Sequence, residues 1–415
     1  MREFSAKKIW LLGLGFFSIS ITWALYNAFV PFFLEKYLSS VSAIGFMMTI
    51  DNYFAIFLQP IIGRLSDRTH SKRGKRMPFL IIGMPLAALF GALIPFHTSF
   101  IVLIVFMVLM NLAMSLYRSP TVALMPDLTP GNKRTQANGI INLMGGIGSI
   151  LAFAGGSYLF EKHTSLPFLS SSLITIACLG ALLYFISEPR DSSTFAPTEN
   201  APKLTSLRGE WNLSTLLLLG AIFFWFFSYQ GVEALFTLYG KNQIGLSEGQ
   251  ASFSLAFFSL AFVLAALPSG MLGSRLGKRK VIMAGVIGLI AIFGLISFVQ
   301  DLWTLRLFLL AGGVFWALIN INSYPFIVAL GKESSIGTRT GIYYFASSLA
   351  AISSPPLLGK LIDLWGYGIL FFAAAGGMAI ALLFLVFIRD QGRNEAEKSG
   401  NNCYRKNFSH AGPHR

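Results

Sequence analysis

The sequence predicts an all-α membrane protein whose chain crosses the bilayer twelve times, arranged as two six-helix halves. The 415 residues are 54% hydrophobic and only 12% charged, whereas soluble domains carry about 25% charged residues. Apolar runs of the length that a bilayer requires, about 20 residues, recur along the whole chain. This composition excludes a soluble enzyme, a disordered chain and a secreted disulfide scaffold. The two cysteines, Cys178 and Cys403, form neither a disulfide framework nor a metal-ligand spacing.

Twelve apolar runs separated by polar loops define the expected spans. In order they cover residues 9–34, 41–62, 77–97, 100–126, 138–160, 168–187, 212–238, 247–273, 280–300, 303–330, 338–362 and 366–388. The first run is too long for a cleaved signal peptide, and no small-residue cleavage site follows it.

The longest polar stretch between runs divides the chain near its middle. Residues 188–211 carry proline, serine and charged side chains, which is typical of a linker. We therefore predict an N-terminal half over 1–187, a cytoplasmic linker over 188–211, a C-terminal half over 212–388 and a cytoplasmic tail over 389–415.

The basic residues are distributed unevenly over the two sides of the predicted spans. Of the 32 lysines and arginines, 26 lie on the side of the termini, five lie in the loops of the other side, and Arg118 lies inside a span. Positive loops stay in the cytoplasm, so both termini are expected there. The net charge of +14 is therefore a topology signal, and we expect no nucleic-acid partner. The sequence predicts a multi-pass protein of the cell membrane, plasma or bacterial inner, in contact with the lipid bilayer.

The two halves repeat each other in sequence. The loop after the second span contains Gly63, Asp67 and Arg68, followed by Gly74, Lys75 and Arg76, and the loop after the eighth span contains Gly270, Ser274 and Arg275. Tyr26-Asn27 and Tyr229-Gln230 also correspond, 203 residues apart. A repeat with equal span counts is a duplicated membrane fold, which is how many secondary transporters are built.

This loop resembles the signature G-x-L-x-D-R-x-G-R-K of the major facilitator superfamily. Here it is expanded to GRLSDRTHSKRGKRMPF over 63–79, which is similar to the sucrose–proton symporters and the glycoside–pentoside–hexuronide symporters. Further support comes from LMPDLTPGNKRTQANG (124–139), EALFTLYG (233–240) and NINSYP (320–325). The resemblance covers all twelve spans. It implies the fold of this superfamily and transport by alternating access.

The loop motif carries a gating hypothesis. Asp67 lies where a span ends, and it can pair with Arg68 or with a neighbouring helix end, whose N-terminus favours a carboxylate. Such a pair would latch two helices in one access state. The alternative is that these charges only enforce topology. The second copy has Ser274 in place of the acid, so we expect a weaker latch there, or none. The predicted gating residues are Gly63, Asp67, Arg68, Gly74, Lys75, Arg76, Gly270 and Arg275.

Three ionisable residues fall well inside predicted spans: Asp51, Arg118 and Glu233. Each costs about 2.5–3.5 kcal/mol at the centre of a membrane helix, so each indicates a function or a structural ion pair. A buried carboxylate beside an arginine can take up and release a proton, so Asp51 and Arg118 are the predicted proton-coupling residues.

The family resemblance bears on both assignments. A sodium-coupled melibiose-type symporter has carboxylates at the positions that align with Ala55 and Gln59. Their absence here favours protons over sodium. The span 4 arginine of plant sucrose symporters aligns with Val122, one helical turn from Arg118, which leaves the equivalence of Arg118 open.

Polar and aromatic residues recur at helical spacing in spans 1, 7 and 10. The predicted substrate-binding residues are Asn27, Tyr229, Glu233, Trp316, Asn320 and Tyr324. Sugars require this combination, because their C–H faces pack on aromatic rings and their hydroxyls need polar partners. The alternative is that these residues form interfacial belts and hydrogen bonds between helices.

Together these features predict proton-coupled symport of a sugar, a disaccharide or small glycoside, by a monomer. The alternative is an exporter or drug–proton antiporter of the same superfamily. An enzyme is not expected, because the spans contain no histidine cluster, no metal-ligand spacing and no nucleophile–base pair. A primary pump is not expected either, because the sequence contains no phosphate-binding loop. We also expect no cofactor and no metal.

Overall fold

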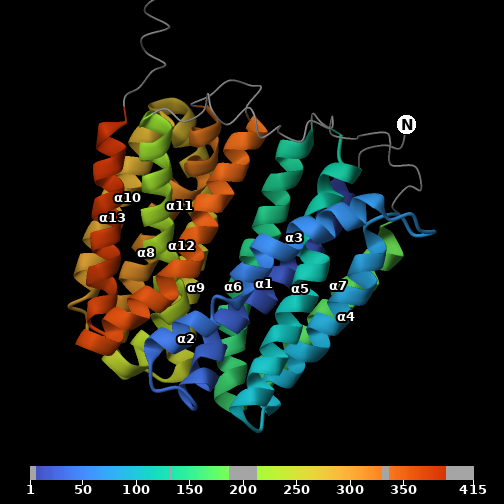
Figure 1. Cartoon of the computed structure of the whole chain (residues 1–415), viewed down its shortest axis with the longest axis horizontal. Helices are drawn as coiled ribbons and strands as arrows, with labels where there is room; N and C mark the ends of the chain where they lie inside the picture. The colour runs from blue at the N-terminus through green and yellow to red at the C-terminus, as the bar shows by residue number, and fades with distance from the viewer. Residues whose placement is uncertain (1–5, 131–132, 187–212, 330–335, 389–415) are drawn as a thin grey trace, which may run out of the picture.

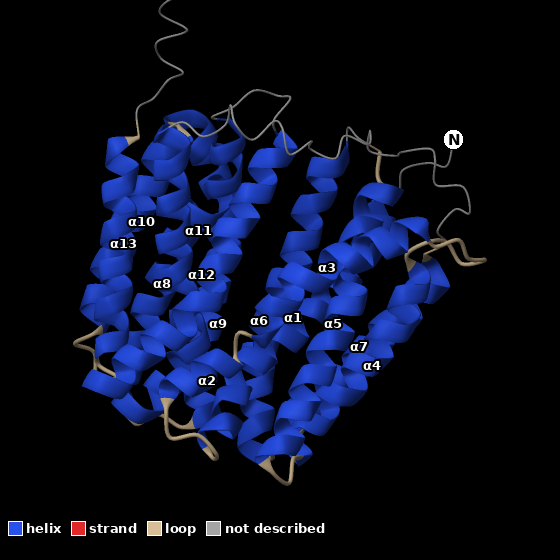
Figure 2. Ribbon diagram, viewed as in Figure 1, coloured by secondary structure: helices blue, strands red, loops and turns tan. Residues whose placement is uncertain are grey.

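The computed structural model describes residues 6–130, 133–186, 213–329 and 336–388, and these residues are helical apart from short loops (Figure 2). Within these described ranges, twelve helical segments are long and apolar enough to cross a membrane, as the sequence predicts. The predicted linker over 188–211 and the tail over 389–415 lie outside the described residues.

The helices of the first half run in the order α1 (Ala6–Glu35), α2 (Val41–Met47), α3 (Ile50–Arg68), α4 (Met77–Leu93), the short 3-10 helix η1 (Ile94–Phe96), α5 (Phe100–Leu128), α6 (Arg134–Lys162) and α7 (Leu166–Phe185). Those of the second half are α8 (Leu213–Ile244), α9 (Glu248–Leu276), α10 (Lys278–Ile296), α11 (Leu302–Ala329), α12 (Ile336–Trp365) and α13 (Ile369–Phe387). Several helices run beyond the predicted spans, because polar residues at their ends continue the helix outside the apolar run.

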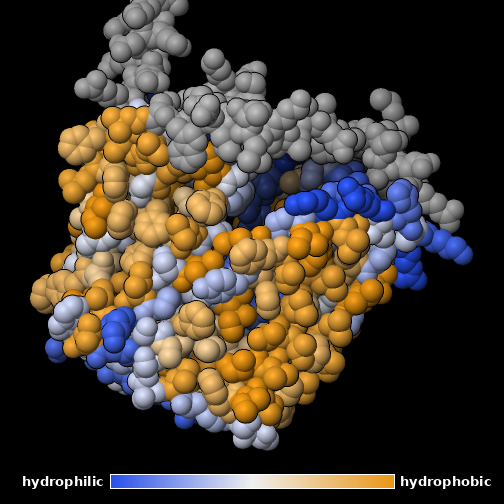
Figure 3. Space-filling view, viewed as in Figure 1, coloured by the Kyte–Doolittle hydropathy of each residue, from blue (hydrophilic) through white to orange (hydrophobic). Residues whose placement is uncertain are grey.

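Each half is a bundle with its own packing (Figure 1). In the first half α1 packs on α6 and α7, and α5 packs on α3 and α4. In the second half α11 packs on α9 and α10, and α8 packs on α12 and α13. Large apolar side chains such as Leu173, Leu267 and Phe298 remain exposed on the outside. Figure 3 shows mostly hydrophobic residues on the outer surface of both halves. Such a surface is compatible with contact with lipid tails.

The second span differs from the expectation of one continuous helix over 41–62. It is interrupted between α2 and α3 at Met48 and Thr49, and it continues to Arg68. Thr49 donates its hydroxyl to the Phe46 carbonyl (2.7 Å), and this bond competes with the regular backbone ladder. A new helix N-terminus therefore lies within the membrane, and Asp51 is in its first turn.

The halves meet at one end of the molecule and diverge at the other (Figure 1). We call the end where α1 begins and α13 ends the terminal end, and the opposite end the distal end. Contacts between the halves join α2 to α12, α1 to α8 and α6 to α9. At the terminal end a hollow opens between the halves, with hydrophilic residues in its depth (Figure 3). The structure is thus open toward the terminal end.

Candidate functional site

A cavity of about 230 Å³ lies between the two halves. Residues of α1, α3 and α5 in the first half and of α8 and α12 in the second contribute to its wall. The lining residues are Trp23, Asn27, Met48, Asp51, Asn52, Arg118, Gln230, Glu233, Ala234, Ala351 and Pro355. All three membrane-embedded charges that the sequence singles out therefore face the same space.

Asp51 lies at the N-terminus of α3, where the helix break leaves backbone N–H groups without helical partners. The positive end of the helix dipole favours a negative charge at this position. The Asn52 amide donates a hydrogen bond to Asp51 Oδ1 (3.0 Å). The break in the helix thus provides a site for a carboxylate inside the membrane.

Arg118 projects from α5 toward the same cavity and lies close enough to Asp51 to interact with it electrostatically. Its guanidinium carbon is 6.0 Å from the centre of the Trp23 ring, in a cation–π arrangement. Val122, one turn further along α5, is exposed and is not among the residues that line the cavity. Of these two positions on α5, Arg118 is the one that lines the cavity.

The opposite wall is formed by α8. The Glu233 carboxyl lies close to the Asn27 amide of α1 and to the Tyr229 hydroxyl, and it also interacts electrostatically with Asp51. The Tyr229 ring stacks on Trp316 of α11, with ring centres 4.0 Å apart and planes 5° apart. Neither Tyr229 nor Trp316 is among the residues that line the cavity. Trp316 is buried and packs on the Tyr229 ring, which in turn lies close to Glu233.

Two other predicted binding residues lie elsewhere on α11. Asn320 is half-buried and Tyr324 is exposed, and neither lines the cavity. The Tyr324 hydroxyl is 3.0 Å from Thr340 Oγ1 of α12, and its ring packs against Tyr343 (5.6 Å). The structure therefore does not bring these two residues together with Glu233, and their role in binding stays a prediction.

Three polar cavity residues are absent from the predicted binding set: Trp23, Asn52 and Gln230. The internal repeat carries a signal for one of them, because Gln230 is the counterpart of Asn27, 203 residues away. The Trp23 indole nitrogen is buried and has no hydrogen-bond partner among the described residues. Ala55 and Gln59, the positions aligned with the sodium-symporter carboxylates, are not in the lining.

The gating motif forms a charge cluster within the first half. Arg76, at the start of α4, pairs with Asp67 and donates from Nε to Asp127 Oδ2 of α5 (2.9 Å). Lys75 Nζ also contacts Asp127 (3.3 Å). The sequence offers Asp67 two partners, Arg68 or a neighbouring helix end. In the structure its partner is Arg76 at the start of α4, and Arg68 is exposed.

Backbone geometry supports this cluster. Gly74 has φ of 96°, a conformation that glycine adopts without steric cost. The Arg76 guanidinium also contacts the Gly63 carbonyl (3.4 Å) and the Ser66 hydroxyl. The cluster ties α3, α4 and α5 together at the terminal end. Sequence reasoning missed Asp127, although the motif over 124–139 contains it.

The repeated loop in the second half binds differently. Lys278 donates to the Pro325 carbonyl (3.1 Å), and Arg279 donates to the Leu385 carbonyl (3.1 Å). Ser274 bonds within its own helix to the Met271 carbonyl. Arg275 is exposed, and a side chain at Gly270 would meet Ile321 at 3.6 Å, an ordinary contact. The contacts of Lys278 and Arg279 among the described residues therefore include backbone carbonyls of α11 and α13.

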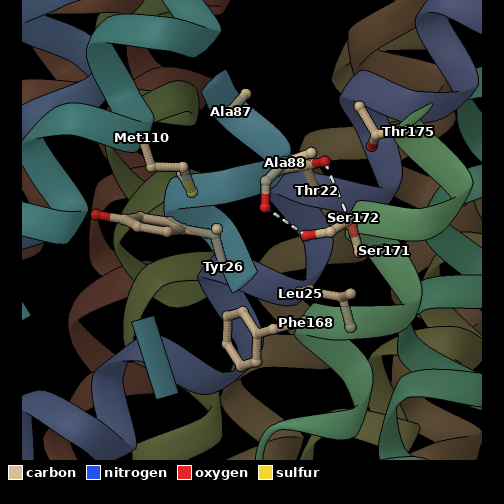
Figure 4. A pocket seen from close by; sticks show the side chains of 11 residues that line it. Thr22, Leu25, Tyr26, Ala87, Ala88, Met110, Phe168, Ser171, Ser172 and Thr175 are labelled. Carbon is tan, nitrogen blue, oxygen red and sulfur yellow. Dashed lines mark hydrogen bonds between the residues drawn. The ribbon is translucent and has the colours of Figure 1, made fainter. Parts of the chain in front are cut away.

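A second, much smaller cavity lies inside the first half, between α1, α4, α5 and α7 (Figure 4). Its volume of about 10 Å³ is close to the minimum that one water molecule needs. Ser172 Oγ donates to the Ala88 carbonyl (2.6 Å), and the Thr22 and Ser171 hydroxyls are 3.4 Å apart. This space is too small for an organic substrate, so the cavity between the halves is the candidate site.

Comparison with known proteins identifies the fold and the family. The family model described as Major Facilitator Superfamily matches residues 12–256 and 235–410. A tetracycline resistance protein, class D, from Salmonella ordonez is 23% identical over 342 residues, which cover 80% of this chain and 84% of that protein. The sucrose transport protein SUC3 of Arabidopsis thaliana is 26% identical over 183 residues, 39% of this chain and 30% of that protein.

Solved structures show the same architecture. A point mutant of the nucleoside transporter NupG superposes with a TM-score of 0.76 at 14% identity, covering 92% of this chain and 100% of that one. A bacterial homolog of the human lysosomal transporter Spinster gives a TM-score of 0.70 at 14% identity, covering 92% and 94%. At these identities the likeness concerns the fold.

Proposed function

The chain belongs to the Major Facilitator Superfamily, and from this premise we propose that it is a proton-coupled symporter of a sugar. As a member it is a multi-pass membrane transporter for a small molecule and not an enzyme. The proposed substrate is a disaccharide or small glycoside. The observation that carries the proposal is the shared cavity in which Asp51 and Arg118 of one half face Glu233 of the other.

The cavity wall suits a molecule with many hydroxyl groups. Asn27, Asn52 and Gln230 each offer an amide donor and acceptor, and Glu233 offers a carboxylate acceptor. The Trp23 indole adds an aromatic surface. Sugars combine C–H faces with hydroxyls, so a wall that mixes aromatic and amide groups matches their surface.

The charges of the cavity support coupling to one cation. Two carboxyl groups, Asp51 and Glu233, face one guanidinium, Arg118, which leaves one negative charge in excess. An uncompensated charge within the membrane is costly. A proton on Asp51 removes the excess, and Arg118 beside it helps to restore the ionised form when the proton leaves. Sodium prefers several oxygen ligands, and Ala55 and Gln59 supply no carboxylate on this helix.

Alternating access requires the open end to change during the cycle. This structure is open at the terminal end, which the proposed topology places in the cytoplasm. In this state Asp67 is held by Arg76 inside its own half. We propose that the cluster around Arg76 positions Asp67 for a different contact when the terminal end closes.

Drug–proton antiport is the second candidate, and one observation favours it. The tetracycline resistance protein from Salmonella ordonez matches 80% of this chain, whereas the match with the sucrose transport protein SUC3 covers 39%. An antiporter could use the same carboxyl groups with the opposite direction of coupling. The two candidates therefore differ in the sign of the proton gradient that drives accumulation.

The test is uptake of a panel of labelled sugars into proteoliposomes, with and without an imposed proton gradient. We expect at least one disaccharide or glycoside to accumulate when the outside is acidic, and to equilibrate only when the gradient is collapsed. The same liposomes are tested with tetracycline as a control solute. Accumulation of tetracycline but of no sugar, driven by an acidic interior, would replace the symporter by the antiporter.

A further inference from the structure

Asp363, near the C-terminal end of α12, binds the first turn of α2 in the other half. Ser40 Oγ donates to Asp363 Oδ2 (2.7 Å), the Val41 N–H donates to Oδ1 (2.7 Å), and the Ser42 N–H donates to Oδ2 (3.1 Å). The first N–H groups of a helix have no partner within the helix. Here a carboxylate from the opposite half binds two of them, at the end of the helix that favours negative charge.

The backbones of α2 and α12 also approach closely beside this carboxylate. Ser42 Oγ donates to the Pro356 carbonyl (2.9 Å). A Cβ on Gly45 would lie 2.3 Å from the Pro355 carbonyl oxygen, and a Cβ on Gly359 would lie 2.6 Å from the Val41 carbonyl oxygen. Two glycines thus allow the close contact that small residues give membrane helices.

This contact closes the distal side of the transport cavity. Met48, directly after α2, and Pro355, on α12, both line the cavity. Since Pro355 also touches Gly45 of α2, the α2–α12 seam separates the cavity from the distal end. The Asp363 carboxylate therefore holds together the two helices that lie between the cavity and the distal end.

A second group of polar contacts joins the halves at the same end. Lys241 of α8 bonds Glu35 of α1 (2.9 Å) and Glu248 of its own half (3.0 Å). Asn242 donates to Glu35 (2.7 Å), and Ser247 donates to Glu161 (2.9 Å). These partners are partly exposed, so water can replace each bond when the halves separate.

We propose that Asp363 is a gating residue: its carboxylate latches α2 to α12 and holds the distal exit shut while the terminal end is open. The latch must release for the distal exit to open, because its donors and its acceptor belong to different halves. A charged acceptor suits this role, since both Asp363 and the α2 N–H groups are well solvated once apart. The inference goes beyond the proposed function, because it does not depend on which solute is carried.

Asp301 offers a matched control. It is also an acid at the distal end, and its Oδ1 accepts a bond from the Thr304 N–H (2.9 Å) at the start of α11. Both partners lie in the second half, so this cap does not connect the halves. Loss of the Asp301 cap should leave the distal opening unchanged.

The experiment measures the distal separation directly. Spin labels are placed at Thr98 and Gln300, exposed positions in distal loops of the two halves, after replacement of the native cysteines. We expect Asp363→Asn to raise the ratio of distal-open to distal-closed molecules about tenfold, in line with the loss of a charge-assisted hydrogen-bond set. Asp301→Asn should give the wild-type distance distribution. An unchanged distribution in Asp363→Asn would overturn the proposal.

A second variant is needed if the other contacts between the halves keep the distal end closed after the Asp363 hydrogen bonds are lost. Ser40→Cys with Asp363→Cys places thiols on both sides of the seam, and a short bifunctional thiol reagent then bridges them. We expect the bridged protein to show only the distal-closed label distance. Protein treated with a monofunctional reagent should still exchange between the distal-open and distal-closed states. Continued distal opening with the bridge in place would show that the seam is not a gate. No transported solute is required, so failure of the sugar proposal would not affect either result.

Discussion

Replacement of Asp51 by asparagine separates coupling from binding. The side chain keeps its shape but can no longer exchange a proton, and the remaining charges Glu233 and Arg118 compensate each other. One charge moved across a membrane potential of 100 mV contributes about 2.3 kcal/mol, which corresponds to an accumulation ratio of about 50. We therefore expect wild-type protein to accumulate sugar up to about 50-fold at that potential, and Asp51→Asn to reach a ratio near one.

The assay is uphill uptake into proteoliposomes beside counterflow, each at several external pH values, with and without sodium. Counterflow should persist in Asp51→Asn, because the amide and aromatic groups of the cavity remain in place. Asp301→Asn, at a loop remote from the cavity, serves as the control. Uphill accumulation by Asp51→Asn would refute the role given to this residue, and sodium-dependent, pH-independent uptake by wild-type protein would refute proton coupling.

Three further expectations follow from the same structure. Glu233→Gln should weaken sugar affinity about 10- to 100-fold, the loss typical of a hydrogen bond to a charged group, read from half-saturation of counterflow; an unchanged affinity would remove Glu233 from the binding site. Asp67→Asn should leave the melting temperature unchanged but slow transport, because the exchange between access states becomes slower. Ser274→Asp should change the transport rate less. Wild-type transport rates in Asp67→Asn would mean that the loop serves only as a topology signal. Reporter fusions within 195–205 should report cytoplasm and a fusion near Lys162 should report the outside, and the reverse pattern would exclude the proposed orientation.

The sequence predicts those features that depend on the cost of charge in a membrane. Asp51, Arg118 and Glu233 stand out because each interrupts an apolar run, and all three line the cavity. The twelve spans are equally visible, since a bilayer sets their length and composition. Their ends are less visible, because polar residues continue several helices into the aqueous phase.

Side-chain direction on α11 could not be predicted from spacing alone. Steps of four residues advance a position by about 40° around a helix, so Trp316, Asn320 and Tyr324 rotate progressively. Trp316 is buried against Tyr229, Asn320 is half-buried and Tyr324 is exposed. The rotation of α11 about its own axis, set by its packing on α9 and α10, decides which of these three side chains comes near α8 and the cavity.

The sequence also could not predict which side chains form ion pairs or hydrogen bonds across a loop or between the two halves. Asp67 has several basic neighbours along the chain, and the fold of the loop selects Arg76. Asp363 follows directly after a predicted span, where a polar side chain is ordinary, and its binding to α2 arises only when the two halves meet. The helix break before Asp51 is likewise a local backbone event within one apolar run.

The most direct test of proton-coupled symport is the movement of protons when substrate is added. Liposomes containing the purified protein are placed in weakly buffered medium with a pH indicator outside, and a transported sugar is added without any imposed gradient. Symport through one titratable carboxyl predicts alkalinisation of the medium, with one proton entering per sugar molecule, and no response in Asp51→Asn. Sugar uptake without a pH change, or acidification of the medium, would contradict it.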